Sequence, residues 1–285
     1  MADQGFDWLN PFASVDLGIA TWADGIKHWA ISHREMIQPI KQFFETVIVG
    51  IESALQATPP MVMLLVLVLI AWQAAGRRGA IVVGVCLAIL GLLAPEAWGL
   101  AMTTLAIVVA SVLLCVLIGL PLGVLAGKSD RFEGFIRPVL DTMQTIPAFV
   151  YLVPVVMMIG IGNVSGVIVT IVFALPPLVR LTSLGIRGVN PSVVEAARAF
   201  GASPGQILRK VELPLATPTI LAGLNQTIML SLSMVVIAAL VGANGLGVPV
   251  IRALNSVNTA LGFESGFIIV VVAILLDRSL RVRVK

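Results

Sequence analysis

The chain has 285 residues, of which 58% are hydrophobic and only 12% are charged. Soluble domains carry about 25% charged residues. This composition therefore excludes an ordinary soluble protein and, with apolar runs of about 20 residues, predicts a polytopic helical membrane protein. The net charge of +3 is better explained by basic residues that anchor spanning helices than by nucleic-acid binding. Cys86 and Cys115 lie inside apolar runs, which argues against a disulfide framework or a metal site.

The first predicted unit, residues 1–57, is polar at its start and helical at its end. Residues 1–34 show no periodic pattern, whereas apolar residues recur every three or four positions over 36–55, with charged residues such as Lys41 and Glu45 between them. This spacing predicts a helix with one apolar face. The helix carries too many charges to span a bilayer, so we expect it either to lie along the extracytoplasmic membrane interface or to pack on the rest of the protein.

Spanning helices are predicted along the remainder of the chain. Seven stretches are apolar and long enough, at residues 60–75, 79–95, 98–127, 139–161, 164–185, 217–242 and 262–277. Prolines interrupt several of them, which spanning helices tolerate because neighbouring helices and water satisfy the freed backbone groups.

The distribution of lysine and arginine predicts the orientation of these spans. With seven spans and the C-terminus in the cytoplasm, 14 of the 18 basic residues fall in cytoplasmic segments, and only Lys27, Arg34, Lys41 and Arg252 remain outside. The opposite orientation reverses this ratio. We therefore expect the N-terminus outside the cytoplasm and the C-terminus inside it.

The stretch "GVLAGKS", Gly123–Ser129, superficially resembles a phosphate-binding loop. Such a loop has four residues between its first glycine and the Gly-Lys pair, whereas Gly123 is followed by only three. The stretch also ends a long apolar helix instead of following a strand. We interpret it as a helix end with a snorkelling lysine, Lys128, and expect the chain to bind no ATP by itself.

A polar segment, residues 186–216, separates two of the most apolar stretches. Asn190-Pro191-Ser192 and Ser203-Pro204-Gly205-Gln206 are both helix-start signals, Gly201 suits a left-handed helix end, and Leu213-Pro214 is expected to end the second helix. Six charged residues in this segment would each cost roughly 2.5–3.5 kcal/mol at the bilayer centre, so we place it in the cytoplasm. From its residues alone it is either an inert surface hairpin or a docking element for a cytoplasmic partner.

Residues 195–214, "EAARAFGASPGQILRKVELP", resemble the EAA loop in the membrane subunits of ATP-binding-cassette importers. The family pattern is Glu-Ala-Ala, three residues, Gly, nine residues, then Ile-x-Leu-Pro, and here only the isoleucine is replaced, by Val211. In that family the loop forms a coupling helix that docks on an ATPase subunit. The resemblance therefore assigns ATPase coupling to Glu195, Ala196, Ala197, Phe200, Gly201, Leu213 and Pro214.

Three further stretches, Leu140–Pro154, Leu175–Val189 and Leu224–Gly247, resemble permeases for quaternary-amine osmolytes such as glycine betaine, proline betaine or choline. One departure is Asn244, where relatives often have glycine. The resemblance implies the type I importer permease fold, all-α with about seven transmembrane helices. It divides the chain after residue 57 into two peripheral helices, residues 58–95, and a core transmembrane domain, residues 96–285.

The resemblance also implies a complex in the bacterial cytoplasmic membrane. Two membrane subunits, expected to be identical, work with cytoplasmic ATPase subunits and an extracytoplasmic substrate-binding protein. The chain is then a transport subunit and not an enzyme. It is expected to hold no cofactor or metal, with ATP and Mg acting through the ATPase that drives alternating access. The alternatives are an importer permease for another small solute or a secondary transporter, which would leave the polar segment without a role.

Asp141 and Arg180 are expected at similar depth, near the cytoplasmic ends of neighbouring spans. Charged groups inside a membrane are costly and are usually paired or turned toward water. The two residues are therefore a possible gate pair. The alternative is that each is hydrated separately among the lipid headgroups.

Overall fold

The computed structural model describes residues 21, 24, 25, 28, 32, 34–93 and 96–280, and all regular elements in this part of the chain are helices. In chain order they are α2 (Arg34–Ala57), α3 (Pro60–Leu93), α4 (Ala97–Lys128), α5 (Asp130–Thr145), α6 (Ala148–Ile159), α7 (Asn163–Arg187), α8 (Pro191–Ala199), α9 (Pro204–Ile207), the π-helical turn η2 (Leu208–Glu212), α10 (Leu213–Leu240), α11 (Gly247–Asn255) and α12 (Thr259–Leu280). The predicted all-α fold is confirmed for these residues. The polar segment predicted for residues 1–34 lies almost entirely outside them.

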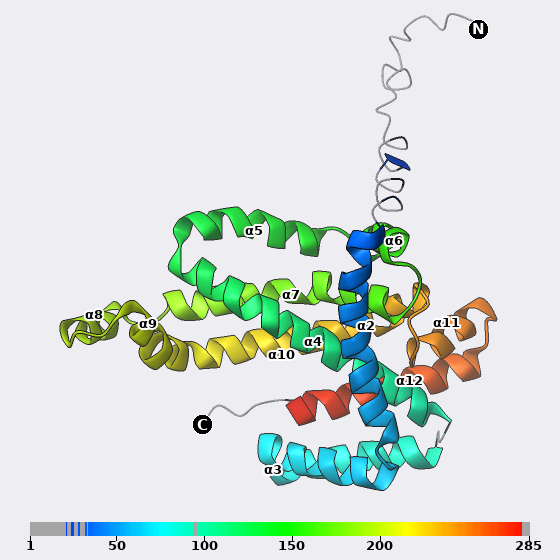
Figure 1. Ribbon diagram of the computed structural model, residues 1–285. Helices are drawn as coiled ribbons and strands as arrows, with labels where there is room; N and C mark the ends of the chain where they lie inside the picture. Colours follow the sequence, from blue (N-terminus) through cyan, green and yellow to red (C-terminus); the bar gives the residue numbers. More distant parts are fainter. Residues whose placement is uncertain are drawn as a thin grey trace, which may run out of the picture.

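The centre of the molecule consists of α4, α7 and α10, which run side by side in Figure 1. Val167, Ile171 and Leu178 of α7 are buried, and they share one apolar core with Leu114 of α4 and Ala238 of α10. Because α7 is covered by α4 and α10, it is the most buried of the candidate spans.

Glycines allow α4 to approach α7 closely. Gly119, Gly123 and Gly127 are four residues apart and so share one helix face. A Cβ atom at Gly123 would lie 2.5 Å from Cβ of Thr182 and 2.9 Å from the carbonyl oxygen of Val179. Small residues at this spacing are typical of contacts between spanning helices, and this contact was not predicted from the sequence.

A second apolar core lies between α3, α12 and the first half of α4. α3 reverses direction at Gly76, whose φ is 72°, and Gly84 of the second arm lies against Val68 of the first. The two arms are helical over the residues predicted to span at 60–75 and 79–95, apart from residues 94 and 95, which lie outside the described part, but the second arm is not among the candidate spans. α12 packs against this pair (Figure 1).

The number of candidate spans is four to six among the described residues, fewer than the seven predicted. Four continuous helical runs are long and apolar enough: α4, α7, residues 204–240 and residues 259–278. Two bent helix pairs could each form one further span: α2 with the first arm of α3, bent by 109°, and α5 with α6, bent by 99°.

The span predicted over residues 139–161 is not one continuous helix. α5 ends at Thr145, Ile146 is extended with φ −72° and ψ 126°, and Pro147 precedes α6. The proline ring disfavours the helical conformation for the residue before it and removes a backbone N–H. The prediction treated this proline as a tolerated interruption, but here it breaks the helix.

The amphipathic helix α2 crosses the central helices (Figure 1) and packs against α4, α6 and α7. Ile48 on its apolar face is 1% exposed. On the same helix, Glu52 accepts a hydrogen bond of 2.7 Å from the hydroxyl group of Thr103 on α4. Both an apolar and a polar contact therefore hold α2 on the core.

Candidate functional site

The polar hairpin, defined as residues 190–212, joins α7 to α10 and protrudes from one end of the bundle (Figure 1). The side chain of Asn190 accepts the Ser192 N–H at 3.0 Å and starts α8. Ser203 and Gln206 form a reciprocal capping box at the start of α9. Both helix starts predicted from sequence are confirmed, and they fix the shape of the hairpin locally.

Gly201 ends α8 in the left-handed conformation, with a φ of 80°. The Gly201 N–H bonds to the Arg198 carbonyl at 2.9 Å, and the Ala202 N–H bonds to the Ala197 carbonyl at 3.1 Å. A Cβ atom at Gly201 would meet nothing within 4 Å. Glycine is therefore favoured by backbone conformation and not by lack of space.

The outer face of α8 has no partner within the described residues. Phe200 is 93% exposed and Val193 is 42% exposed, and Ala196 is also exposed between them. Glu195 is exposed and forms no ion pair within the described part of the chain. A short helix that offers a large aromatic ring, small alanines and one carboxylate is suited to contact with another protein.

The second helix of the hairpin does not end at Leu213-Pro214, contrary to the prediction. Helix runs on through η2 into α10, from Pro204 to Leu240. Pro214 lies just after the π-helical turn η2 and is therefore inside the continuous helix instead of ending it. The preceding turn is π-helical, a local widening that is frequent at functional sites. The second half of the hairpin, from Pro204, and α10 therefore form one continuous helical rod, which α8 joins through the turn at Gly201.

An ion pair at the base of the hairpin links it to α4. The Nζ atom of Lys128, the last residue of α4, lies 2.5 Å from each carboxylate oxygen of Glu212. Glu212 is 5% exposed and is the one acidic or basic residue of the described part that is buried. Lys128 is therefore not a free snorkelling side chain. The sequence does indicate that Glu212 is buried, because Leu208 and Ala216, four residues before and after it, place it on an apolar helix face.

Two further sets of ion pairs connect α5 to α7. Arg180 donates a hydrogen bond to Asp141, so the structure brings these two predicted residues together. Arg187 lies 2.6 Å from Asp130 and 2.8 Å from Glu133, and it also donates to the Ala126 carbonyl at 2.7 Å. A cavity of about 320 Å³ lies between these contacts.

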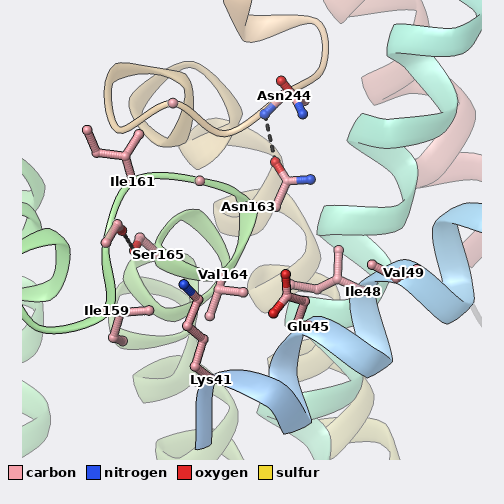
Figure 2. Close-up of a pocket in the computed structure, with 13 residues that line it drawn as sticks. Lys41, Glu45, Ile48, Val49, Ile159, Ile161, Asn163, Val164, Ser165 and Asn244 are labelled. Carbon is pink, nitrogen blue, oxygen red and sulfur yellow. Dashed lines mark hydrogen bonds between the residues drawn. The ribbon is translucent and has the colours of Figure 1, made fainter. Parts of the chain in front are cut away.

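A pocket lies at the other end of α7 and α10, where the chain turns from α6 into α7 and from α10 into α11. Its volume is about 210 Å³, and α2 forms one wall. Figure 2 shows Lys41 and Glu45 directed from α2 toward the two turns. The Asn163 side chain joins the turns by accepting the Asn244 N–H at 2.7 Å. We call this cavity the α2–α7 pocket.

No group of three His, Cys, Asp or Glu residues suited to a metal ion occurs among the residues whose positions are described.

Comparison with known proteins places these features in a family. The family described as "Binding-protein-dependent transport system inner membrane component" matches residues 119–282. The chain is 47% identical over 276 residues to the glycine betaine/proline betaine transport system permease protein ProW of Escherichia coli (strain K12), which covers 96% of this chain and 77% of ProW.

Two other relatives and a solved structure are also similar to this chain. The chain is 44% identical to the glycine betaine transport system permease protein OpuAB of Bacillus subtilis (strain 168), over 80% of each protein. It is 40% identical to the glycine betaine/carnitine transport permease protein GbuB of Listeria monocytogenes serotype 1/2a (strain 10403S), over 91% of this chain and 93% of GbuB. An inward-facing structure of the MetNI methionine ABC transporter superimposes with a TM-score of 0.55 at 25% identity, over 60% of this chain and 86% of that one.

Proposed function

The chain belongs to the family of binding-protein-dependent transport system inner membrane components, and we propose that it is the permease subunit of an ATP-driven importer of glycine betaine and proline betaine. It is a multi-pass protein of the inner membrane and a transport component rather than an enzyme. The relatives named above supply the substrate class. The resemblance to MetNI supports the type I permease fold.

The observation that carries the proposal is the polar hairpin. It projects from the bundle, is capped at both of its helix starts and leaves Phe200 and Val193 uncovered within the described residues. We assign docking of a cytoplasmic ATPase to Glu195, Ala196, Ala197, Phe200 and Gly201. Leu213 and Pro214 begin α10 and receive the movement of the hairpin.

The mechanism follows from how the hairpin is attached. ATP and Mg bind to the partner ATPase, and closure of that partner moves the docked hairpin. The second half of the hairpin, α9 and η2, is continuous with α10 and is held to α4 by Lys128 and Glu212. A rigid element of this kind transmits a displacement to packed helices, which then exchange between two arrangements. We propose that Asp141 and Arg180 form one contact of the inner gate in this exchange.

The orientation is part of the proposal. The polar hairpin, Lys128 and Arg187 lie at one end of the bundle, and an excess of basic residues favours the cytoplasmic side. We therefore place this end in the cytoplasm and the α2–α7 pocket outside, facing an extracytoplasmic binding protein. The family resemblance supports two identical copies of the chain in the membrane part.

The test is uptake by the complete complex in proteoliposomes. Gly201→Ala places a side chain at a φ that costs about 1–2 kcal/mol in an L-residue, so we expect betaine uptake to fall severalfold while ATP hydrolysis persists. Gly205→Ala is the matched control, because it lies in the same hairpin with open space and no positive φ. Equal uptake by both variants, or ATP-independent accumulation by the chain alone, would overturn the proposal.

A further inference from the structure

The α2–α7 pocket has the dimensions and the polarity of a small-molecule site. It is a cavity of about 210 Å³ with walls from three separate segments: α2, the turn into α7 and the turn between α10 and α11. The two turns are fixed by backbone constraints. The Gly162 N–H bonds to the Val241 carbonyl at 3.0 Å. Gly242 has a φ of 74°, and a Cβ atom there would lie 2.3 Å from Ile161.

Two opposite charges face this cavity without neutralising each other. Lys41 and Glu45 are one helical turn apart on α2, the spacing at which such residues usually pair. No ion pair forms between them within the described residues. Lys41 extends instead toward Gly160, where its Nζ atom would lie 4.0 Å from an added Cβ atom. Figure 2 shows both charged groups on the cavity side of α2.

The surroundings of the two charges differ in a way that suits a molecule with two unlike ends. Lys41 lies near the start of α7, whose cap residue Gly162 offers no side-chain acceptor. The positive end of that helix dipole therefore adds to the lysine charge and favours an anion. Glu45 lies beside Ile48 and Val49. A carboxylate next to apolar side chains fits a cation that carries methyl groups and has no hydrogen to donate.

We propose that the α2–α7 pocket binds a zwitterionic quaternary amine, with the carboxylate of the ligand at Lys41 and its ammonium group at Glu45. The ligand class rests on the proposed function, since a betaine joins these two charges in one small molecule. The site receives the substrate on the extracytoplasmic side, before the molecule enters the path between the helices. Charge pairing at the two ends selects zwitterions over simple cations.

The experiment measures binding without the substrate-binding protein. The permease and its ATPase are placed together in nanodiscs, and glycine betaine is titrated by saturation-transfer NMR on its methyl signal. Choline, which lacks the carboxylate, is the ligand control. We expect saturable binding of glycine betaine and at least tenfold weaker binding of choline.

Variants locate the site. Glu45→Gln and Lys41→Met each remove one charge and are expected to weaken glycine betaine binding at least tenfold. Lys41→Met should also abolish the preference over choline, which a merely structural effect would not do. Glu35→Gln is the matched control, because Glu35 lies on the same helix and does not line the pocket.

Three results would overturn this proposal. Glycine betaine could fail to bind, or its binding could be unchanged in both variants. The variants could instead raise only the concentration of binding protein that half-maximally stimulates the ATPase, which would make the pocket a protein-docking surface. Failure of the proposed function is distinguishable, because the complete complex would then not accumulate betaine in proteoliposomes whatever the binding measurement shows.

Discussion

Two ion pairs near the hairpin end of the molecule use the same chemistry in different surroundings. At the base of the polar hairpin, the Glu212 side chain is 7% exposed, with Lys128 at 40%. Between α5 and α7, the side chains of Asp141 and Arg180 are 52% and 41% exposed. Exposed pairs contribute at most about 1 kcal/mol because water competes for both partners. A buried carboxylate that loses its partner costs about 3–5 kcal/mol.

The difference suits two mechanical roles. The Lys128–Glu212 pair is costly to open, so we expect it to persist as a joint between α4 and the helix that runs from Pro204 to Leu240. The Asp141–Arg180 pair can exchange its partner for water at little cost, which suits a contact that must open in each transport cycle.

Lys128→Met should give the largest loss of stability, because it leaves the Glu212 carboxylate buried and unpaired. We expect the free energy of unfolding to fall by about 3–5 kcal/mol, measured by denaturant or thermal unfolding of the purified chain in detergent. The double variant Lys128→Met with Glu212→Met should recover most of the loss, because apolar replacement of a buried pair is often neutral. A Lys128→Met protein as stable as the wild type would remove the distinction between the two pairs.

Gly123→Ala tests the packing between α4 and α7 instead of an ion pair. The added Cβ atom would lie 2.5 Å from Thr182, so α4 and α7 must separate, at a cost of roughly 1–3 kcal/mol. Gly134→Ala on α5 meets nothing within 4 Å and should be neutral or stabilising by about 0.5–1 kcal/mol. Unfolding midpoints of the two variants provide the comparison. Equal midpoints would show that close approach of α4 and α7 is not required.

Local signals account for what the sequence predicted correctly. Asn190, Ser203 and Gly201 specify caps through their own backbone and side-chain chemistry, so their positions could be read without tertiary information. The apolar runs of α4, α7, α10 and α12 are likewise long enough to predict spanning helices from the sequence alone. The EAA spacing predicts that the hairpin docks an ATPase, and this role stays a prediction.

Tertiary context accounts for what the sequence did not reveal. Pro147 and Pro214 are both prolines beside apolar stretches, yet one separates α5 from α6 and the other lies inside the helix that runs from Pro204 to Leu240. Which outcome occurs depends on whether packing of the following segment favours a bend. Glu212 pairs with Lys128, which is 84 positions earlier in the chain. No local sequence pattern specifies a partner at that separation.

Arg180→Met should have the smallest effect on stability, below about 1 kcal/mol, because Asp141 remains solvated when its partner is removed.

The effect of Arg180→Met should appear instead in the transport cycle. Without the contact, the state described here loses one stabilising interaction, so we expect basal ATP hydrolysis in the absence of binding protein to change while the unfolding midpoint stays within error. The exchanged pair Asp141→Arg with Arg180→Asp should restore the basal rate, since the attraction survives reversal of the charges. Arg187→Met is the matched comparison, because Arg187 holds Asp130, Glu133 and the Ala126 carbonyl together and should lower stability more than Arg180→Met does. If the exchanged pair behaves no better than the single variants, Asp141 and Arg180 are hydrated independently during transport and do not form a gate contact.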